Sequence, residues 1–172
     1  MNYSTLLTAG AALLTAACAS SPLVVPEALR PATTEMLGTT VGARGVQIYE
    51  CRARKDGGGY EWAFVAPDAD LLDAQGRAIG RHGAGPYWQS ADGSRVVGTV
   101  KARADAPASS AIPWLLLSTK SSGPAGAFSN VSSIQRVNTV GGVAPATPCT
   151  AQFAGRPARV PYTADYRLFT AR

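Results

Sequence analysis

The stretch VQIYECRARKDGGGYEWAFVAP, residues 46–67, decides the fold class. It is divided by the glycine-rich turn KDGGG, and after the turn the aromatic and apolar side chains recur at every second position, as Tyr60, Trp62, Phe64 and Ala66. A period of two places alternate side chains on one face of a strand, and two such runs around a short glycine turn are typical of a β-hairpin. We therefore expect residues 46–67 to form a hairpin.

Further segments along the chain repeat this spacing. Residues 70–82 and 87–103 each fit another hairpin around a short polar turn, and apolar or alternating runs at 112–117, 134–139 and 160–169 fit single strands. No strongly amphipathic helix interrupts them. The sequence thus predicts an all-β domain of roughly seven to nine strands, either a single antiparallel sandwich or a small barrel, and does not choose between these two architectures.

Length and composition fit one folded domain. The chain has 172 residues, with 46% hydrophobic and only 16% charged residues, which lies outside the range typical of disordered proteins. Eighteen glycines and twelve prolines without a fixed period indicate many turns. The net charge of +5 is spread along the chain. We expect no nucleic-acid binding, because phosphate recognition needs a concentrated basic face.

The amino terminus has the pattern of an export signal. Residues 6–17 are uncharged and mostly Leu, Ala and Thr, and Cys18 follows directly. Twelve residues are too short to cross a bilayer as a helix, so we interpret residues 1–17 as a signal peptide. The small residues before Cys18 resemble the lipobox of bacterial lipoproteins, although Thr15 stands where that motif usually has Leu. The resemblance implies lipidation of Cys18, and secretion without lipid is the alternative.

The same resemblance implies a destination and a domain boundary. Ala19 follows the cysteine in place of the Asp that retains lipoproteins in the inner membrane, which implies an outer-membrane anchor facing the periplasm. We expect residues 18–44 to comprise the lipidated cysteine and a flexible tether, and residues 45–172 to form the β domain. The predicted partner of the amino terminus is therefore the membrane of the cell envelope.

The cysteines predict one disulfide. If Cys18 carries lipid, Cys51 and Cys149 remain as a pair in an oxidising compartment, where an even number of thiols suggests a disulfide. The chain has a single histidine, which leaves too few ligands for a metal site. We expect no metal.

Six separate blocks follow one another along the chain: GVQIYEC (45–51), WAFVAPDADL (62–71), GRHGAGPYWQSADGS (80–94), IPWLLL (112–117), IQRVNTVGG (134–142) and VPYTADYRLF (160–169). In this order they resemble the DUF3455 family of uncharacterised proteins. The resemblance covers about residues 45–169. It implies that these blocks belong to one domain of exported bacterial and fungal proteins, and it brings no known function.

His82 is the candidate for catalysis. It precedes a glycine-rich turn, and Asp92 follows ten residues later, so a histidine–carboxylate pair for general base chemistry is one hypothesis. The alternative is a structural histidine that packs against a turn. No Gly-x-Ser-x-Gly motif marks a nucleophile, so we expect a binding protein more than an enzyme.

A ligand-binding pocket is the second hypothesis. Aromatic side chains with a few polar groups are the usual lining of a small-molecule site. The candidate ligand-binding residues are His82, Trp88, Arg136, Tyr162 and Asp165. Arg136 has two interpretations, because a guanidinium among apolar neighbours either forms a buried ion pair, with Asp165 or Glu50, or captures an anionic ligand.

Three functions remain open from the sequence. The first is a binding module for a small apolar or aromatic ligand, which predicts a real cavity. The second is an envelope protein-interaction or inhibitor-type module. The third is a hydrolase-like enzyme that uses His82. No dinucleotide or ATP motif is present, so we expect no cofactor.

Overall fold

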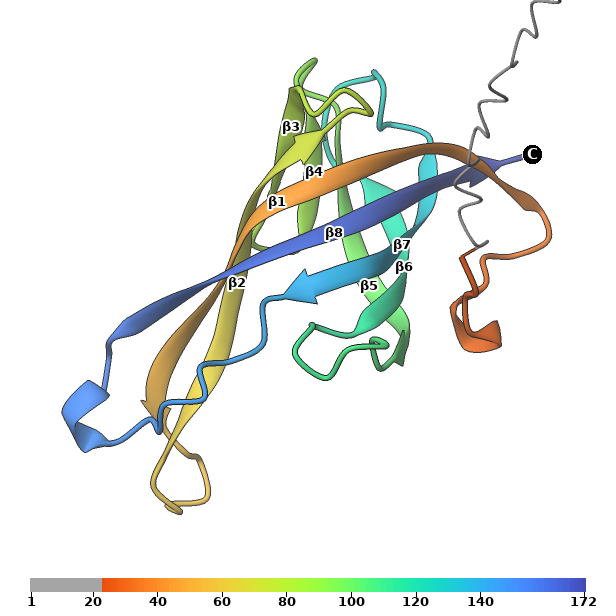
Figure 1. Cartoon of the computed structure of the whole chain (residues 1–172). Coiled ribbons are helices and arrows are strands. Elements are labelled where there is room, and N and C mark those ends of the chain that lie inside the picture. The colour runs from red at the N-terminus through yellow and green to blue at the C-terminus, as the bar shows by residue number, and fades with distance from the viewer. Residues whose placement is uncertain (1–22) are drawn as a thin grey trace, which may run out of the picture.

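The structure is a computed structural model that describes residues 23–172 (Figure 1). It contains one antiparallel sheet with the strand order β1-β2-β3-β4-β5-β6-β7-β8, and β1 also pairs with β8, so the sheet closes into a barrel. The predicted all-β fold is therefore confirmed. Of the two predicted architectures the chain adopts the barrel, because the first and last strands are long and complementary enough to pair with each other.

Every strand is hydrogen-bonded to its neighbour in sequence, as in a chain of hairpins. Two single turns of 3₁₀ helix, η1 (Glu27–Leu29) and η2 (Ala151–Phe153), precede β1 and β8. The strands are β1 (Glu35–Ala53), β2 (Tyr60–Leu72), β3 (Ala78–Gly83), β4 (Tyr87–Ser90), β5 (Arg95–Ala104), β6 (Trp114–Ser121), β7 (Val131–Gly141) and β8 (Pro157–Ala171).

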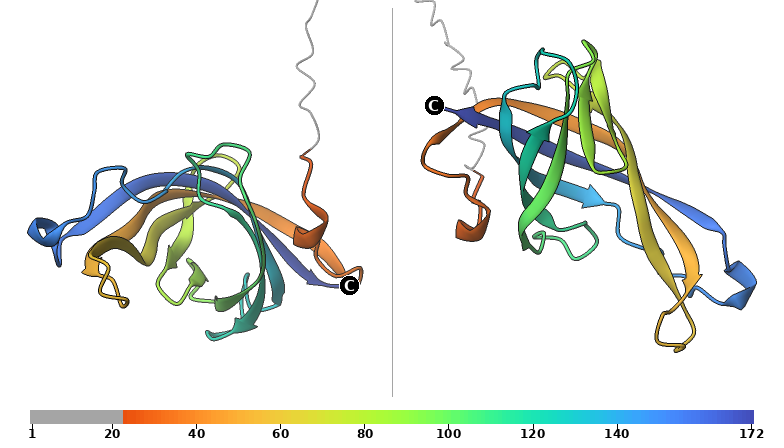
Figure 2. Two further views of the ribbon diagram at one scale, coloured as in Figure 1. Left: turned by 90° about the horizontal axis from the view of Figure 1, so that it is seen from below. Right: turned by 180° about the vertical axis from the view of Figure 1, so that it is seen from behind.

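The predicted hairpin at residues 46–67 is present, with Cys51 opposite Trp62 and a register shift between Ile48 and Tyr49. β1, β2 and β8 are the longest strands, and their paired ends extend beyond the ring as an arm that carries the turn between β1 and β2 (Figures 1 and 2). The predicted disulfide is confirmed: Cys51 is bonded to Cys149. It ties β1 in this arm to the segment that leads into β8.

The domain begins earlier than the predicted residue 45, because β1 starts at Glu35. The preceding segment also packs against the sheet: Leu29 is completely buried in an apolar cluster with Trp114, Leu116 and Val137. The expected flexible tether is thus replaced by ordered structure from about residue 25 onward. The reason is that β6 and β7 carry apolar side chains on the outer face of the ring, and Leu29 covers them.

The interior of the ring holds the main core. Because side chains alternate along each strand, one set from every long strand points inward. This set is mostly aliphatic and includes Val41, Leu71, Val96, Ile134 and Leu168. The proposed signal peptide and Cys18 lie outside the described residues. Across residues 23–172 no helix has both the length and the hydropathy needed to span a membrane.

Candidate ligand-binding cavity

The ring encloses a cavity of about 720 Å³ that is open on one side. This volume is in the range of pockets that bind small molecules, and eight strands leave just such a space when the inward side chains do not fill it. The lining comes from all eight strands and three connecting segments: Gln47, Tyr49, Phe64, Val65, Pro67, His82, Gly85, Pro86, Trp88, Val100, Arg103, Ile112, Pro113, Leu115, Leu117, Arg136, Val143, Ala144 and Tyr166.

The exposed part of the lining includes Arg103 of β5 and an apolar rim, which is formed by Phe64 and Val65 of β2 and Val100 of β5. These three side chains line the cavity although 53%, 43% and 53% of their surfaces, respectively, are exposed. The Phe64 ring also contacts the ring of Tyr49 edge-on, with 5.8 Å between centroids. Exposed apolar groups gathered around an opening are typical of binding sites, because an apolar ligand removes them from water.

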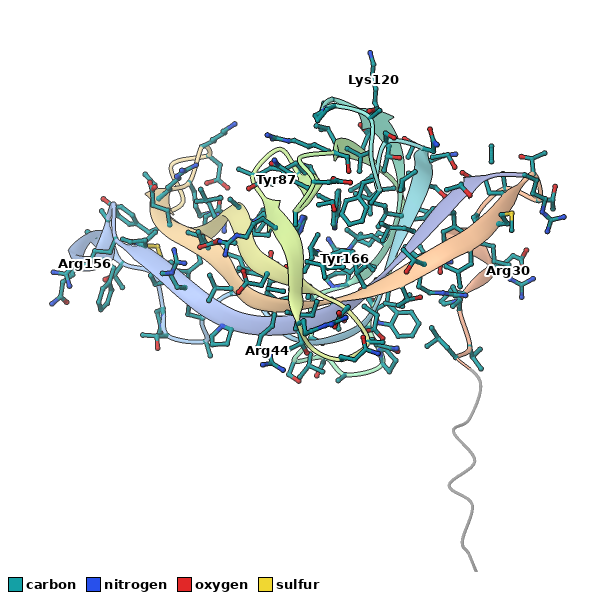
Figure 3. The ribbon with its side chains drawn as sticks, turned by 90° about the horizontal axis from the view of Figure 1, so that it is seen from above. Arg30, Arg44, Tyr87, Lys120, Arg156 and Tyr166 are labelled. Carbon is teal, nitrogen blue, oxygen red and sulfur yellow. A yellow bond between two sulfur atoms is a disulfide. The ribbon has the colours of Figure 1, made fainter. Side chains whose placement is uncertain are left out.

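Three aromatic side chains, His82, Trp88 and Tyr166, form the floor of the cavity. Each is almost completely buried. The His82 ring stacks on Trp88 at 4.3 Å between centroids, and Tyr166 meets both rings edge-on. Figure 3 shows Tyr166 in the middle of the molecule, within the curve of the sheet. Rings that hold one another in place in this way give the cavity a rigid base.

His82 is uncharged near neutral pH. The pKa of its imidazole is lowered to about 4, mainly by burial and also by the positive charge of Arg136, while a hydrogen bond to the Tyr87 carbonyl opposes both effects. Because a carbonyl oxygen can only accept, Nδ1 carries the proton and donates to Tyr87 at 2.7 Å. The second ring nitrogen, Nε2, is then a neutral acceptor.

Arg136 points into the ring because side chains alternate along β7. Ile134 belongs to the interior core, whereas Gln135 and Val137 contact the Leu29 segment outside. The Arg136 Nε and Nη2 atoms donate to the carbonyl oxygen of Pro113 at 3.0 and 2.8 Å. This carbonyl oxygen is neutral and leaves the guanidinium charge uncompensated.

The predicted ion pair of Arg136 with Asp165 or Glu50 is wrong. In the part of the chain that the structure describes, no carboxylate lies within 4.0 Å of Arg136. Asp165 instead accepts a hydrogen bond from the Asn138 side chain at 2.7 Å, and Glu50 pairs with Arg52 at 2.8 Å. The physical reason is alternation along β8, which places Tyr166 on the inner face and Asp165 on the outer one.

The structure brings three of the five predicted ligand-binding residues together in the cavity: His82, Trp88 and Arg136. Tyr162 does not line the cavity and lies behind Tyr166, with 3.5 Å between the two hydroxyl oxygens. Burial raises the pKa of Tyr162 far above its usual value, so its hydroxyl stays protonated. Asp165 is on the opposite face of the sheet.

The structure does not bring His82 and Asp92 together as a catalytic pair. Asp92 accepts hydrogen bonds from the Ser94 hydroxyl and backbone and from the backbone of Ala127, which together lower its pKa to about 2. These bonds fix the turn between β4 and β5 to the loop before β7. In residues 23–172 no carboxylate is hydrogen-bonded to His82, and no three His, Cys, Asp or Glu side chains are grouped as metal ligands.

Sequence reasoning missed Gln47 and the rim residues as parts of the site. Gln47 of β1 is buried and lines the cavity beside Ile112 and Tyr162, which both crowd around Gly142. A polar residue on the buried side of an otherwise apolar strand face is the signal that could have found it. Nothing in the sequence distinguishes Val100 from an ordinary core residue, since its exposure depends on how the ring closes.

A model of the family described as "Protein of unknown function (DUF3455)" matches residues 31–170. The match includes β1 from its beginning, in agreement with the early start of the domain. No curated protein and no solved structure matches the chain. The cavity must therefore be interpreted from its own chemistry.

Proposed function

The chain belongs to the DUF3455 family, and because that family has no assigned function, we propose from the cavity that this protein binds a small apolar or aromatic ligand. The observation that carries the proposal is the apolar rim around an open cavity of about 720 Å³. Exposing Phe64, Val65 and Val100 to water is unfavourable for a protein without a ligand. A bound apolar molecule would cover all three.

The geometry favours binding over a hydrolase. His82 is held by the Tyr87 carbonyl and by stacking on Trp88, which fixes the ring as part of a wall. A general base needs a nucleophile or a water-activating partner within hydrogen-bond distance, and no described serine or threonine hydroxyl is hydrogen-bonded to His82. His82 therefore supports the cavity in this proposal.

The direct test is titration of the purified, disulfide-bonded protein with N-phenyl-1-naphthylamine, an uncharged aromatic dye whose fluorescence rises in apolar sites. We expect saturable binding to the wild type, weakened several-fold in Val100→Gln. The matched control is Val140→Gln: Val140 is also an exposed valine, on β7, but does not line the cavity. Absence of binding, or equal loss in both variants, would contradict the proposal and favour the rim as a contact surface for another protein.

The natural ligand can be identified by native mass spectrometry of the protein purified from cells. A co-purifying small molecule of defined mass supports the proposal and names the ligand class. The same mass must be lost from Val100→Gln and kept in Val140→Gln if it occupies the cavity. A molecule retained equally by both variants is bound elsewhere and does not support the proposal.

We further propose that the protein is exported and anchored to the cell envelope, in the outer membrane, through lipid on Cys18. The apolar segment before Cys18 and the Cys51–Cys149 disulfide support export. Mass spectrometry of the mature amino-terminal peptide is the test. A diacylated peptide that begins at Cys18 is the expected result, and an unmodified terminus at another residue indicates secretion without an anchor.

A further inference from the structure

We infer that the cavity selects amphipathic monoanions, in which an acid group binds at Arg136 and an apolar body lies toward the rim of Phe64, Val65 and Val100. The inference rests on the proposed function and narrows it to one ligand class, organic acids with an aromatic or aliphatic body. Three independent features of the cavity carry it: an uncompensated cation, unpartnered buried donors and the absence of lining carboxylates.

The first feature is the charge on Arg136. A guanidinium removed from water is unfavourable unless it is paired with an anion, and here its hydrogen bonds from Nε and Nη2 both go to one neutral carbonyl oxygen. The two hydrogen bonds to the Pro113 carbonyl also fix the orientation of the guanidinium plane. A ligand therefore binds without the entropic cost of ordering this side chain. Arginine in a fixed plane is suited to carboxylates and similar anions, because its N–H groups match two oxygens at once.

The second feature is a pair of buried donors without acceptors. The side-chain amide nitrogen of Gln47 and the indole nitrogen of Trp88 are buried and have no hydrogen-bond partner in the described chain. The two side chains line the cavity and are 2% and 1% exposed. Buried N–H groups left unpaired are unfavourable, and the oxygens of an acid group would supply the missing acceptors.

The third feature is the charge of the lining as a whole. No Asp or Glu is among the residues that line the cavity, whereas Arg103 and Arg136 both are. Tyr49 adds no negative charge, because burial raises the pKa of its hydroxyl, which stays protonated. His82 is uncharged, because burial lowers the pKa of its imidazole. An anion that enters from the rim therefore meets attraction from two cations and repulsion from no lining carboxylate.

The apolar rim and the unpartnered donors lie at different levels of burial. Phe64, Val65 and Val100 are exposed lining residues, with Arg103 of β5 as an exposed cation in the same lining, whereas the unpartnered donors belong to buried residues. A ligand that matches this arrangement enters with its acid group first. Its apolar body then remains near the opening, where it covers the rim.

The test uses two dyes that share an anilinonaphthalene body: 1-anilinonaphthalene-8-sulfonate, which is an anion, and N-phenyl-1-naphthylamine, which is neutral. Both are titrated into the wild type, into Arg136→Gln and into the control Arg44→Gln. Arg44 is an exposed residue of β1 that points to the outer side of the sheet, so this variant loses the same charge away from the cavity (Figure 3).

We expect Arg136→Gln to weaken binding of the anionic dye about tenfold or more, as for loss of a charged hydrogen bond, and to change binding of the neutral dye less than about twofold. Arg44→Gln should leave both affinities unchanged. Equal effects of Arg136→Gln and Arg44→Gln, or no effect on the ratio of the two affinities, would overturn the inference. Failure of the neutral dye to bind the wild type would instead overturn the proposed function itself.

A second pair of variants keeps the test decisive if Arg136→Gln does not fold. Arg136→Lys keeps the charge and loses the planar fork, and Gln47→Met keeps the shape of the side chain and loses the unpartnered donor. Each should lower the affinity for the anionic dye relative to the neutral one within the same protein. An unchanged ratio in both variants contradicts the inference.

Discussion

Gln47 and Gln135 are two buried glutamines, 2% and 1% exposed, on opposite faces of the ring. Gln135 faces outward, and both of its polar atoms are hydrogen-bonded: its Nε2 donates to the Leu29 carbonyl at 2.6 Å, and its Oε1 accepts from Arg167 at 3.0 Å. Gln47 faces the cavity, and its Nε2 has no partner within residues 23–172. The outer glutamine has protein partners for both of its polar atoms, whereas the inner one leaves its amide nitrogen without a protein partner.

The comparison indicates which buried polar residues serve the fold and which serve binding. A buried group with all its partners stabilises one arrangement of the chain. A buried group with unfilled bonding capacity, next to an open space, is unfavourable for the fold and is typical of a functional site. The outer face of β7 should therefore control stability alone, and the cavity should control affinity.

The largest expected effect is on the outer face. Leu29→Ala removes the completely buried side chain that joins the amino-terminal segment to Trp114, Leu116 and Val137. We expect the free energy of unfolding to fall by about 2–5 kcal/mol in urea denaturation, with unchanged affinity for both dyes in the folded protein. Leu23→Ala, at a more exposed position of the same segment, is the control. If Leu29→Ala instead lost dye binding with little loss of stability, the expectation that the outer face controls stability and the cavity controls affinity would be wrong.

The second effect concerns pH and the cavity floor. The unfolded chain protonates His82 near its ordinary pKa of 6.5, but the folded protein does so only near pH 4. Between these values the unfolded state binds more protons, so stability falls as the pH is lowered through this window, by about 3 kcal/mol in total. Because the chain has one histidine, His82→Phe should remove most of this slope in denaturation at pH 7, 6 and 5. An unchanged slope would show that His82 is not buried as described.

The third effect concerns Gln135, the buried glutamine whose two polar atoms both have protein partners. Gln135→Met keeps the volume of the side chain but leaves the Leu29 carbonyl and the Arg167 guanidinium without their partner. We expect a loss of about 1–3 kcal/mol in the free energy of unfolding, because the two groups stay partly buried. Binding of either dye should not change. A stability equal to that of the wild type would mean that water replaces the amide on the outer face.

The smallest expected change in stability is at Gln47, the buried glutamine whose amide nitrogen has no protein partner. Gln47→Met removes a donor that has no partner, so the free energy of unfolding should change by less than about 1 kcal/mol. The affinity for the anionic dye should nevertheless fall several-fold. The two variants together form the sharpest test, since the same substitution is made at two buried glutamines. A larger loss of stability at Gln47 than at Gln135 would break the comparison.

The sequence predicted those features that depend on local pattern. The hairpin at residues 46–67 follows from alternation around a glycine turn, and the Cys51–Cys149 disulfide was predicted from the even number of thiols that remain when Cys18 is set aside. The barrel could not be distinguished from a sandwich, because closure depends on pairing between the two ends of the domain, β1 and β8.

The candidate site was predicted in part for a related reason. His82 was found because it is the single histidine, Trp88 because aromatic side chains commonly line small-molecule sites, and Arg136 because a guanidinium is unusual among apolar neighbours. The wrong partner of Arg136 and the omission of Gln47 have the same cause: the sequence does not show which face of a strand points into the barrel. Alternation shows only that two neighbouring side chains point in opposite directions. Likewise, burial of Leu29 depends on β6 and β7, which lie about a hundred residues away in the sequence.

The packed amino-terminal segment has a consequence for the position of the protein at the membrane. With lipid on Cys18, as proposed, only residues 19–24 separate the anchor from Val25, which packs against the barrel. Six residues span at most about 20 Å, a distance smaller than the thickness of a bilayer. This short tether would then keep the barrel close to the lipid surface. There the cavity could take up amphipathic acids that leave the membrane.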